Sequence, residues 1–333
     1  MTLDVNALLG ELSRERQAGV STTTLNLIGF VDDPELLEWL HKRTDKISDK
    51  YPSRSILLDA CHDESLHEIR SARRNPDDET ATIRAEQLVI GVRGINAIEL
   101  RSIVHALTVP NVPTMLVWTG KQLAADERFE QLVDIATSII VDSSRFESTN
   151  AGLHDLVQFI GAGERVQDLA YMRLRPWQDA VAEFFDDEEL TAQLPRIERV
   201  QIASGSAAEG YYFMGWLASR LGWKPCDTHK FCNIEGNNID VKFEREGQVR
   251  RVQRVQLETG KTTFCAEIQA EGAGVICATI CGALNRPKRC LPIPTLDMVS
   301  LVEQAILLPQ SDDVFRDSLA MAREVLQLED RSA

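Results

Sequence analysis

The sequence predicts a mixed α/β fold (α+β overall), with a mostly parallel sheet covered by helices on both faces in the N-terminal half and an antiparallel sheet plus helices in the C-terminal half. Short, continuously apolar segments alternate with helix-period segments up to about residue 142, which is typical of buried parallel strands. From residue 239 onward, apolar and polar residues alternate with a period of two, which indicates strands with one wet face. The 333 residues contain no repeat and no low-complexity linker, and we expect two domains, residues 1–165 and 166–333.

The N-terminal half contains the apolar runs expected for a parallel sheet. The predicted strands are residues 22–30, 55–60, 86–92, 114–118 and 138–142. The predicted helices are residues 34–40, 97–107, 124–136 and 152–161, and Asp33 before Pro34 is a natural N-cap for the first of them. Residues 62–74 are polar and favour a helix or a loop. Because the second and third strands lack an obvious crossover helix, part of the sheet is open to an antiparallel arrangement.

The segment from Asp168 to Trp223 joins the two halves and is rich in aromatic residues. Pro176 suits the first turn of a helix, and apolar residues from Trp177 to Phe184 recur at helical spacing after it. A second helix is predicted from Ala207 to Leu221, apolar nearly all round, with Gly222 ending it. We expect these aromatic side chains to form a hydrophobic core between the halves.

Strands and two closing helices are predicted for the remainder. The strands are residues 239–244, 249–257, 264–269 and 275–281, and the helices are residues 297–307 and 313–328.

The composition excludes several classes of partner. The formal net charge is −15, whereas binding to nucleic acid or to an anionic membrane requires clustered Lys and Arg. No apolar run reaches the roughly 18–20 residues that a membrane span needs, and the first residues lack the pattern of a signal peptide. We therefore expect a cytoplasmic protein.

The seven cysteines are an odd number in a long chain, which favours reduced thiols over a disulfide framework. Cys226, His229 and Cys232 leave a zinc site open as an alternative, with Cys265 or Cys290 as the fourth ligand, although this spacing is not that of a familiar structural zinc site. Cys277 and Cys281 lie about 13 Å apart along one strand, too far to pair with each other. Cross-strand pairs of Cys265 with Cys277 or Cys281 remain open.

No catalytic pattern stands out in the sequence. The chain has no Gly-x-Gly-x-x-Gly fingerprint and no Walker pattern, which predicts no dehydrogenase activity and no bound nicotinamide cofactor. No Ser–His–Asp or Cys–His arrangement is evident. The loop Ser204-Gly205-Ser206 before the 207–221 helix is the best candidate for an anion site, although serines at such a position usually cap the helix.

Two blocks of the central segment carry a resemblance to a known family. The first reads Asp168-Leu-Ala-Tyr-Met-Arg-Leu-Arg-Pro-Trp177, and the second reads Gly215-Trp-Leu-Ala-Ser-Arg-Leu-Gly-Trp223. Upstream, Leu25-Asn-Leu-Ile28, Pro52-Ser-Arg54, Val112-Pro113 with Leu116 and Trp118, and Ile140-Val-Asp-Ser143 follow the same order. This ordered set resembles the OpcA family of glucose-6-phosphate dehydrogenase assembly proteins over about residues 20–225.

The resemblance implies a non-enzymatic assembly factor and allosteric activator, without a cofactor, that binds glucose-6-phosphate dehydrogenase and promotes its active oligomer in the oxidative pentose phosphate pathway. Arg173, Arg175 and Arg220 flank the aromatic segment and are candidate partner-binding residues, with pairing to local carboxylates such as Asp168 or Glu209 as the alternative. In some cyanobacterial members cysteine redox state modulates activation, which makes Cys265, Cys277 and Cys281 candidate redox residues. The rival hypothesis is an enzyme or sensor that binds a sugar phosphate or nucleotide at Ser204–Ser206.

Overall fold

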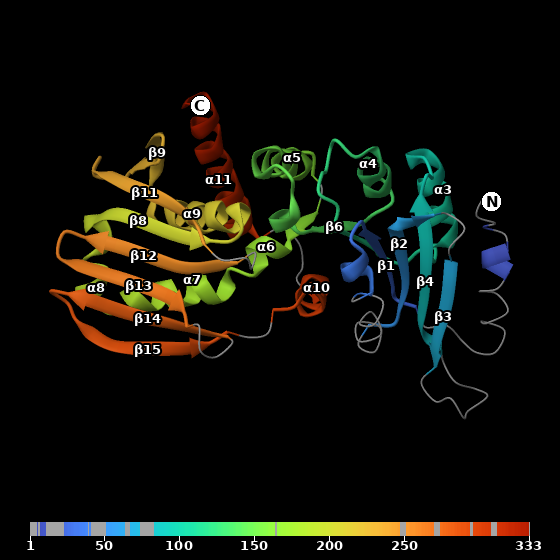
Figure 1. The fold of residues 1–333 in the computed structure, drawn as a ribbon, viewed down its shortest axis with the longest axis horizontal. Helices are drawn as coiled ribbons and strands as arrows, with labels where there is room; N and C mark the ends of the chain where they lie inside the picture. Colours follow the sequence, from blue (N-terminus) through green and yellow to red (C-terminus); the bar gives the residue numbers. More distant parts are fainter. Residues whose placement is uncertain are drawn as a thin grey trace. The chain divides into compact units, whose positions relative to one another are not determined.

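The computed structural model describes residues 5, 7–10, 23–38, 40, 51–63, 67–73, 83–163, 165–246, 251–269, 274–293, 296–307 and 312–332. The chain forms two compact units, each with its own sheet (Figure 1). Unit 1 consists of residues 1–147, 159–167 and 302–309, and unit 2 consists of residues 148–158, 168–301 and 310–333.

The sheet of unit 1 has the strand order β3-β4-β2-β1-β5-β6-β7 within the described residues. Its strands are β1 (Leu25–Val31), β2 (Ser53–Asp63), β3 (His67–Arg73), β4 (Ile83–Arg93), β5 (Thr114–Trp118), β6 (Ser138–Val141) and β7 (Val166–Asp168). Strands β4, β2, β1, β5 and β6 are parallel neighbours, and Ile28 of β1 lies between Ile56 of β2 and Leu116 of β5. Every residue of β1 and β5 is buried, as expected of a central parallel strand.

Two helices of unit 1 begin where the sequence provides a capping side chain. Helix α3 (Ala97–Leu107) is capped by Asn96, whose side chain accepts from the N–H of Glu99. Helix α4 (Glu127–Val133) is capped by Asp126 in the same way. With the parallel strands, these helices confirm the predicted fold class for the N-terminal half.

The prediction of a polar helix or loop at residues 62–74 is wrong. Strand β2 continues to Asp63, and β3 pairs antiparallel with the outer edge of β4, with His67 opposite Ile90. Strands β2 and β4 are parallel, and β3 lies between them in the chain. An edge strand tolerates a polar sequence because only one of its sides is paired, so the sequence pattern there carried little strand signal.

The sheet of unit 2 has the order β15-β14-β13-β12-β8-β11-β10-β9 among the residues that the structure describes. Its strands are β8 (Ile197–Ser204), β9 (Lys224–Asp227), β10 (Lys230–Cys232), β11 (Asn238–Arg245), β12 (Val252–Thr259), β13 (Thr262–Ile268), β14 (Val275–Gly282) and β15 (Arg286–Pro292). The pairs are antiparallel except for β8 with β11, which is parallel. The predicted antiparallel character is therefore confirmed, with one parallel pair, β8 and β11, in the sheet.

The remaining helical elements connect or cover these sheets. They are α5 (Thr149–Gly161), α6 (Leu169–Met172), α7 (Arg175–Ala182), α8 (Glu188–Thr191), α9 (Ala207–Leu221), α10 (Met298–Leu307), α11 (Asp313–Ser332) and the 3₁₀ turns η1 (Ser143–Arg145), η2 (Glu183–Phe185) and η3 (Leu194–Arg196). No helix among the described residues is long and apolar enough to cross a membrane.

Helix α9 is the central helix of unit 2. It begins after the cap Ser206 and ends at Gly222, whose φ of 68° is the left-handed conformation that glycine adopts readily. It packs along α11, and Gly215 lies so close to that helix that an added Cβ would sit 2.2 Å from the carbonyl oxygen of Ser318. The pair of helices is therefore in contact through the backbone itself at this point.

We predict opposite effects for two Gly→Ala changes on α9. Gly215→Ala should destabilise unit 2 strongly, because the new methyl group collides with the α11 backbone. Gly210→Ala should be neutral or stabilising by up to about 1 kcal/mol, because its Cβ makes only ordinary contacts, with Phe243 at 3.5 Å and Ile202 at 3.9 Å, and alanine favours the helix. Urea denaturation of both variants measures the difference, and equal stabilities would contradict the close helix contact.

Candidate functional site

The carboxyl edge of the parallel sheet in unit 1 is the place where this type of fold binds ligands. The chain runs from β1 outward through β2 to β4 and then returns to β5 on the other side of β1. The direction of strand order therefore switches between β1 and β5. The residues that follow the strands at this edge are Asp32 and Asp33 after β1, Asp59 in β2, Thr119 after β5, and Asp142 after β6.

Asp33 lies at the start of the helical residues that follow β1. Its Oδ1 accepts hydrogen bonds from the backbone N–H groups of Glu35, at 3.1 Å, and Leu36, at 3.3 Å. Its Oδ2 accepts from Nη2 of Arg145 at 3.0 Å. Partial burial opposes ionisation, but the hydrogen bonds and charge of Arg145 outweigh it and lower the pKa of Asp33. The predicted N-cap is confirmed, and its carboxylate is ionised near neutral pH.

Arg145 comes from the 3₁₀ turn η1, and its side chain lies across the strand ends. Besides the contact with Asp33, its Nε donates to the backbone oxygen of Thr119 at 3.1 Å, and its Nη2 lies 3.9 Å from Oδ1 of Asp32. Only 15% of the Arg145 side chain is exposed. No sequence signal points to Arg145, because it is 112 positions away from Asp33 and belongs to no motif.

Two aromatic rings pack against each other at the ends of β1 and β5. The rings of Phe30 and Trp118, from the ends of β1 and β5, stack with centroids 4.0 Å apart. The guanidinium of Arg128 lies 4.8 Å from the Phe30 centroid while it pairs with Asp126. The space next to Trp118 is tight, since a Cβ on Gly120 would lie 2.7 Å from the indole.

The acidic residue of β2 at this edge, which lies opposite Val31 at the end of β1, is also engaged. Asp59 is fully buried, and its Oδ1 accepts from the N–H groups of Cys61 and His62, while its Oδ2 lies 2.5 Å from Nδ1 of His62. Burial and the neighbouring Asp59 raise the pKa of the Cys61 thiol to about 11. The thiol therefore stays protonated at neutral pH and is a poor nucleophile.

A second polar network lies in unit 2 at the start of α9. Nε of Arg173 donates to Oε1 of Glu209 at 2.7 Å, and the N–H of Val252 donates to Oε2 at 3.0 Å. Both side chains of the ion pair are buried, with 9% of Arg173 and 1% of Glu209 exposed. Nearby, the hydroxyl of Tyr212 donates to Asp168 at 2.7 Å. Pairing with a local carboxylate, the alternative for Arg173, is therefore what the structure shows.

The Ser204–Ser206 loop does not fit the anion site of the rival hypothesis. The hydroxyl of Ser204 donates to the backbone oxygen of Ser206 and accepts from its N–H, and the hydroxyl of Ser206 accepts from the N–H of Glu209. Both serines are buried, and the acidic Glu209 stands in the first turn of the helix that follows them. The donors of the loop are thus used inside the protein, and the neighbouring charge is negative.

The other two candidate arginines are on the surface of unit 2. Arg175 pairs with Asp179 at 3.2 Å, with 78% of its side chain exposed. Arg220 pairs with Asp317 at 2.5 Å, with 42% exposed. Both pairs are open to solvent, so a partner protein can reach these arginines and Arg173 is out of reach.

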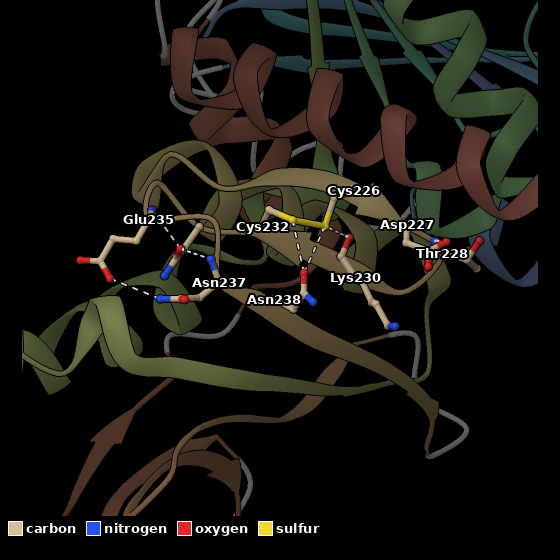
Figure 2. The surroundings of a disulfide bond; sticks show 9 residues. Cys226, Asp227, Thr228, Lys230, Cys232, Glu235, Asn237 and Asn238 are labelled. Atoms are coloured by element: carbon tan, nitrogen blue, oxygen red, sulfur yellow. Dashed lines mark hydrogen bonds between the residues drawn. A yellow bond between two sulfur atoms is a disulfide. The ribbon is translucent and has the colours of Figure 1, made fainter.

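The expectation of reduced thiols is wrong for four of the seven cysteines in this structure. Cys226 and Cys232 form a disulfide across β9 and β10, with Cα atoms 5.9 Å apart (Figure 2). Because these sulfurs are joined to each other, the zinc alternative does not fit. His229 lies instead 3.4 Å from Glu329, and the described residues contain no cluster of three metal-binding side chains.

The second disulfide joins Cys277 and Cys290, which are opposite each other on β14 and β15. From the sequence, only cross-strand pairs of Cys277 or Cys281 with Cys265 were left open, because the sequence does not give the register of β15. Cys265 and Cys281 are free thiols on neighbouring strands, and burial raises the pKa of Cys265.

Comparison with family models covers most of the chain. Residues 44–158 match the glucose-6-phosphate dehydrogenase subunit N-terminal domain, and residues 164–319 match the C-terminal domain of the same subunit, both models of the OpcA family. The chain belongs to the OpcA family. The earlier resemblance is confirmed.

Relatives in cyanobacteria carry the same name. An OxPP cycle protein OpcA of Synechocystis is 27% identical over 68% of this chain and 52% of its own length. The OpcA protein of Nostoc punctiforme is 35% identical over 41% of this chain and 29% of its own. The chain thus spans about half the length, or less, of these curated relatives. Their names and the family models fit a role associated with glucose-6-phosphate dehydrogenase.

Solved structures with the same fold are oxidoreductases. A 3-ketoreductase of Actinomadura kijaniata, in complex with NADP, aligns over 92% of this chain and 96% of its own with a TM-score of 0.53 and 9% identity. An oxidoreductase of Sinorhizobium meliloti aligns over 92% and 98% with a TM-score of 0.53 and 10% identity. At these identities the likeness shows the fold alone.

We predict that the buried ion pair of unit 2 is essential to its stability. Glu209→Ala should lower the free energy of unfolding by about 3–5 kcal/mol, because it leaves the Arg173 charge buried without this partner and frees the N–H of Val252. Asp317→Ala is the matched control, because it removes the partner of an exposed arginine and should cost at most about 1 kcal/mol. Equal losses in urea denaturation would contradict this assignment.

Proposed function

We propose that the chain binds glucose-6-phosphate dehydrogenase directly and favours its active oligomer, without catalysing a reaction itself. The observation that carries this proposal is the match of residues 44–158 and 164–319 to the two domains of a glucose-6-phosphate dehydrogenase subunit. A binding protein activates an enzyme when it binds the active arrangement more tightly than the inactive one, which shifts the population toward the active form. We place the protein in the cytoplasm with its partner, and propose neither nucleic acid nor membrane as a binding partner.

The candidate sites support a binding role. At the carboxyl edge of unit 1, the carboxylates of Asp33 and Asp59 are held by groups of the same chain. At the start of α9, Glu209 is likewise saturated by Arg173 and Val252. A general acid or base needs a proton-transfer position open to substrate, and these carboxylates are engaged internally.

Arg175 and Arg220 are the proposed contacts with the dehydrogenase. Their present partners, Asp179 and Asp317, are exposed carboxylates 60% and 55% accessible, so the pairs contribute little to folding. Exchanging such a partner for a carboxylate of another protein costs little, and arginine is enriched at interfaces. Arg173 is excluded from this set because it is buried with Glu209.

The test is to mix the purified chain with its cognate glucose-6-phosphate dehydrogenase, to follow complex formation by size exclusion, and to assay the dehydrogenase across a titration. We predict a larger co-eluting complex and a rate that rises to saturation. If the two proteins elute separately and the rate of the dehydrogenase is unchanged, both with reductant and with oxidant, the proposal is wrong.

The double variant Arg175→Ala/Arg220→Ala should raise the concentration needed for half-maximal activation by about tenfold, the equivalent of roughly 1.4 kcal/mol. Arg101→Ala is the control, because Arg101 is an exposed arginine of unit 1 that pairs with Asp134 in the same way. If the control and the double variant need the same concentration for half-maximal activation, the assignment of these arginines is wrong. The titration with the wild type still shows whether the chain binds at all.

Redox dependence is a further part of the proposal. The candidate residues Cys265, Cys277 and Cys281 lie on β13 and β14, and Cys277 is in the disulfide with Cys290. We expect the activation titration to differ between reduced and oxidised protein, and Cys277→Ser/Cys290→Ser to remove the part of that difference that this disulfide causes. An identical titration in both redox states would leave the cysteines without a regulatory role.

A further inference from the structure

The fold of unit 1 implies a dinucleotide site at a defined place. In sheets of this kind, the pyrophosphate lies on the N–H groups that start the helix after the first parallel strand, next to a glycine-rich turn. In chain order the parallel strands are β1, β2, β4, β5 and β6, and in space they run β4-β2-β1-β5-β6. The place of the pyrophosphate is therefore the turn Val31-Asp32-Asp33-Pro34, between the ends of β1 and β5.

The residues at this turn do not fit a dinucleotide. The turn contains no glycine, whereas the fold needs glycine there so that the pyrophosphate can approach the backbone. Two successive aspartates stand in its place, and carboxylates repel a phosphate group at short range. The N–H groups of Glu35 and Leu36, which would receive the phosphate oxygens, already donate to Asp33.

The positive charge that would bind a phosphate, the guanidinium of Arg145, is already paired with Asp33. Nη2 of Arg145 lies 3.0 Å from Oδ2 of Asp33, so one carboxylate bridges the helix start and the guanidinium, as a phosphate would. The same guanidinium holds the backbone of Thr119 at the end of β5. The ends of the two strands on either side of the switch point are thus linked through Arg145.

The acidic residue that would bind the ribose is present in the sequence, but in the structure its carboxylate is already engaged. In this fold an acidic residue at the end of the second strand binds the ribose hydroxyls. Asp59 of β2, opposite Val31 at the end of β1, is the acidic residue nearest to that position, but it is fully buried and its oxygens accept from Cys61 and His62. The ribose would find no free carboxylate oxygen there.

From these contacts we infer that Asp33 and Arg145 fill the anion position of a dinucleotide-binding fold from within the chain, so that unit 1 binds neither NAD nor NADP. The carboxylate of Asp33 takes the place of the phosphate and Arg145 neutralises it. The inference does not depend on binding to the dehydrogenase, because it concerns only the groups at the edge of this sheet.

Titration of the full chain with NADPH, followed by its fluorescence, and with NADP and NAD by calorimetry tests the first part. We expect no saturable signal up to about 1 mM of each dinucleotide, the range of very weak binding. Saturable binding of any of the three at micromolar concentration would overturn the inference.

The second part is tested by removing the internal carboxylate. Asp33→Ser keeps a capping side chain but removes the carboxylate nearest to Arg145, leaving Asp32 at 3.9 Å, and makes room beside the guanidinium. Inorganic phosphate should then raise the Tm of this variant by at least about 2 °C over sodium chloride of equal ionic strength, because a ligand that binds only the folded state stabilises it. The wild type should show no such difference.

Asp187→Ser is the matched control. Asp187 caps α8 and has Arg286 within 3.9 Å, but Arg286 keeps Glu189 as its main partner when Asp187 is removed. The control should not gain a response to phosphate. If Asp33→Ser does not fold, Asp33→Gly replaces it, since glycine also serves at an N-cap. An equal response in variant and control, or none in the Asp33 variant, would refute the internal replacement.

Discussion

The architecture of unit 2 depends on the buried carboxylate of Glu209. Its two oxygens receive the guanidinium of Arg173 and the N–H of Val252, which ties the end of α6 and the start of α9 to β12. A buried charge is tolerated only when its partners are close and well oriented, because its desolvation costs several kcal/mol. Since α9 also packs on β8 and along α11, fixing its first turn fixes the layer that covers the sheet. The capping hydroxyl of Ser206 completes the turn, so what looked like a candidate anion loop is part of this support.

The regular elements were predictable where a local pattern encodes them. Helix α3 was predicted with its observed bounds, and α9 with its start at Ala207 and its end before Gly222, because periodicity and capping residues lie within one stretch of sequence. Strand β3 was missed because an edge strand has no apolar run. The disulfide partner of Cys277 was missed because it depends on the register between β14 and β15, which no local signal gives. The Asp33–Arg145 contact could not be foreseen, since it joins residues that only the closed sheet brings together.

Unit 1 and unit 2 use their acidic residues in the same way. In one, Asp33 and Asp59 are satisfied by a helix start, a turn and an arginine, and in the other Glu209 and Asp168 are satisfied by Arg173 and Tyr212. Enzymes keep some buried polar groups unsatisfied until substrate arrives, and this readiness costs stability. At these two sites Asp33, Asp59 and Glu209 are engaged, whereas Oδ1 of Asp32 is buried without a hydrogen-bond partner and lies 3.9 Å from Nη2 of Arg145.

Burial separates the three arginines of the central segment. Arg173 cannot change partner, because separating it from Glu209 would break an ion pair between two buried charges. Arg175 and Arg220 hold exposed aspartates by contacts worth at most about 1 kcal/mol each, because water and salt screen them. A carboxylate of another protein that excluded water around either arginine would make a stronger pair than the one it replaced. The same sequence segment therefore contains one arginine that fixes the fold and two that are free to exchange, and only burial distinguishes them.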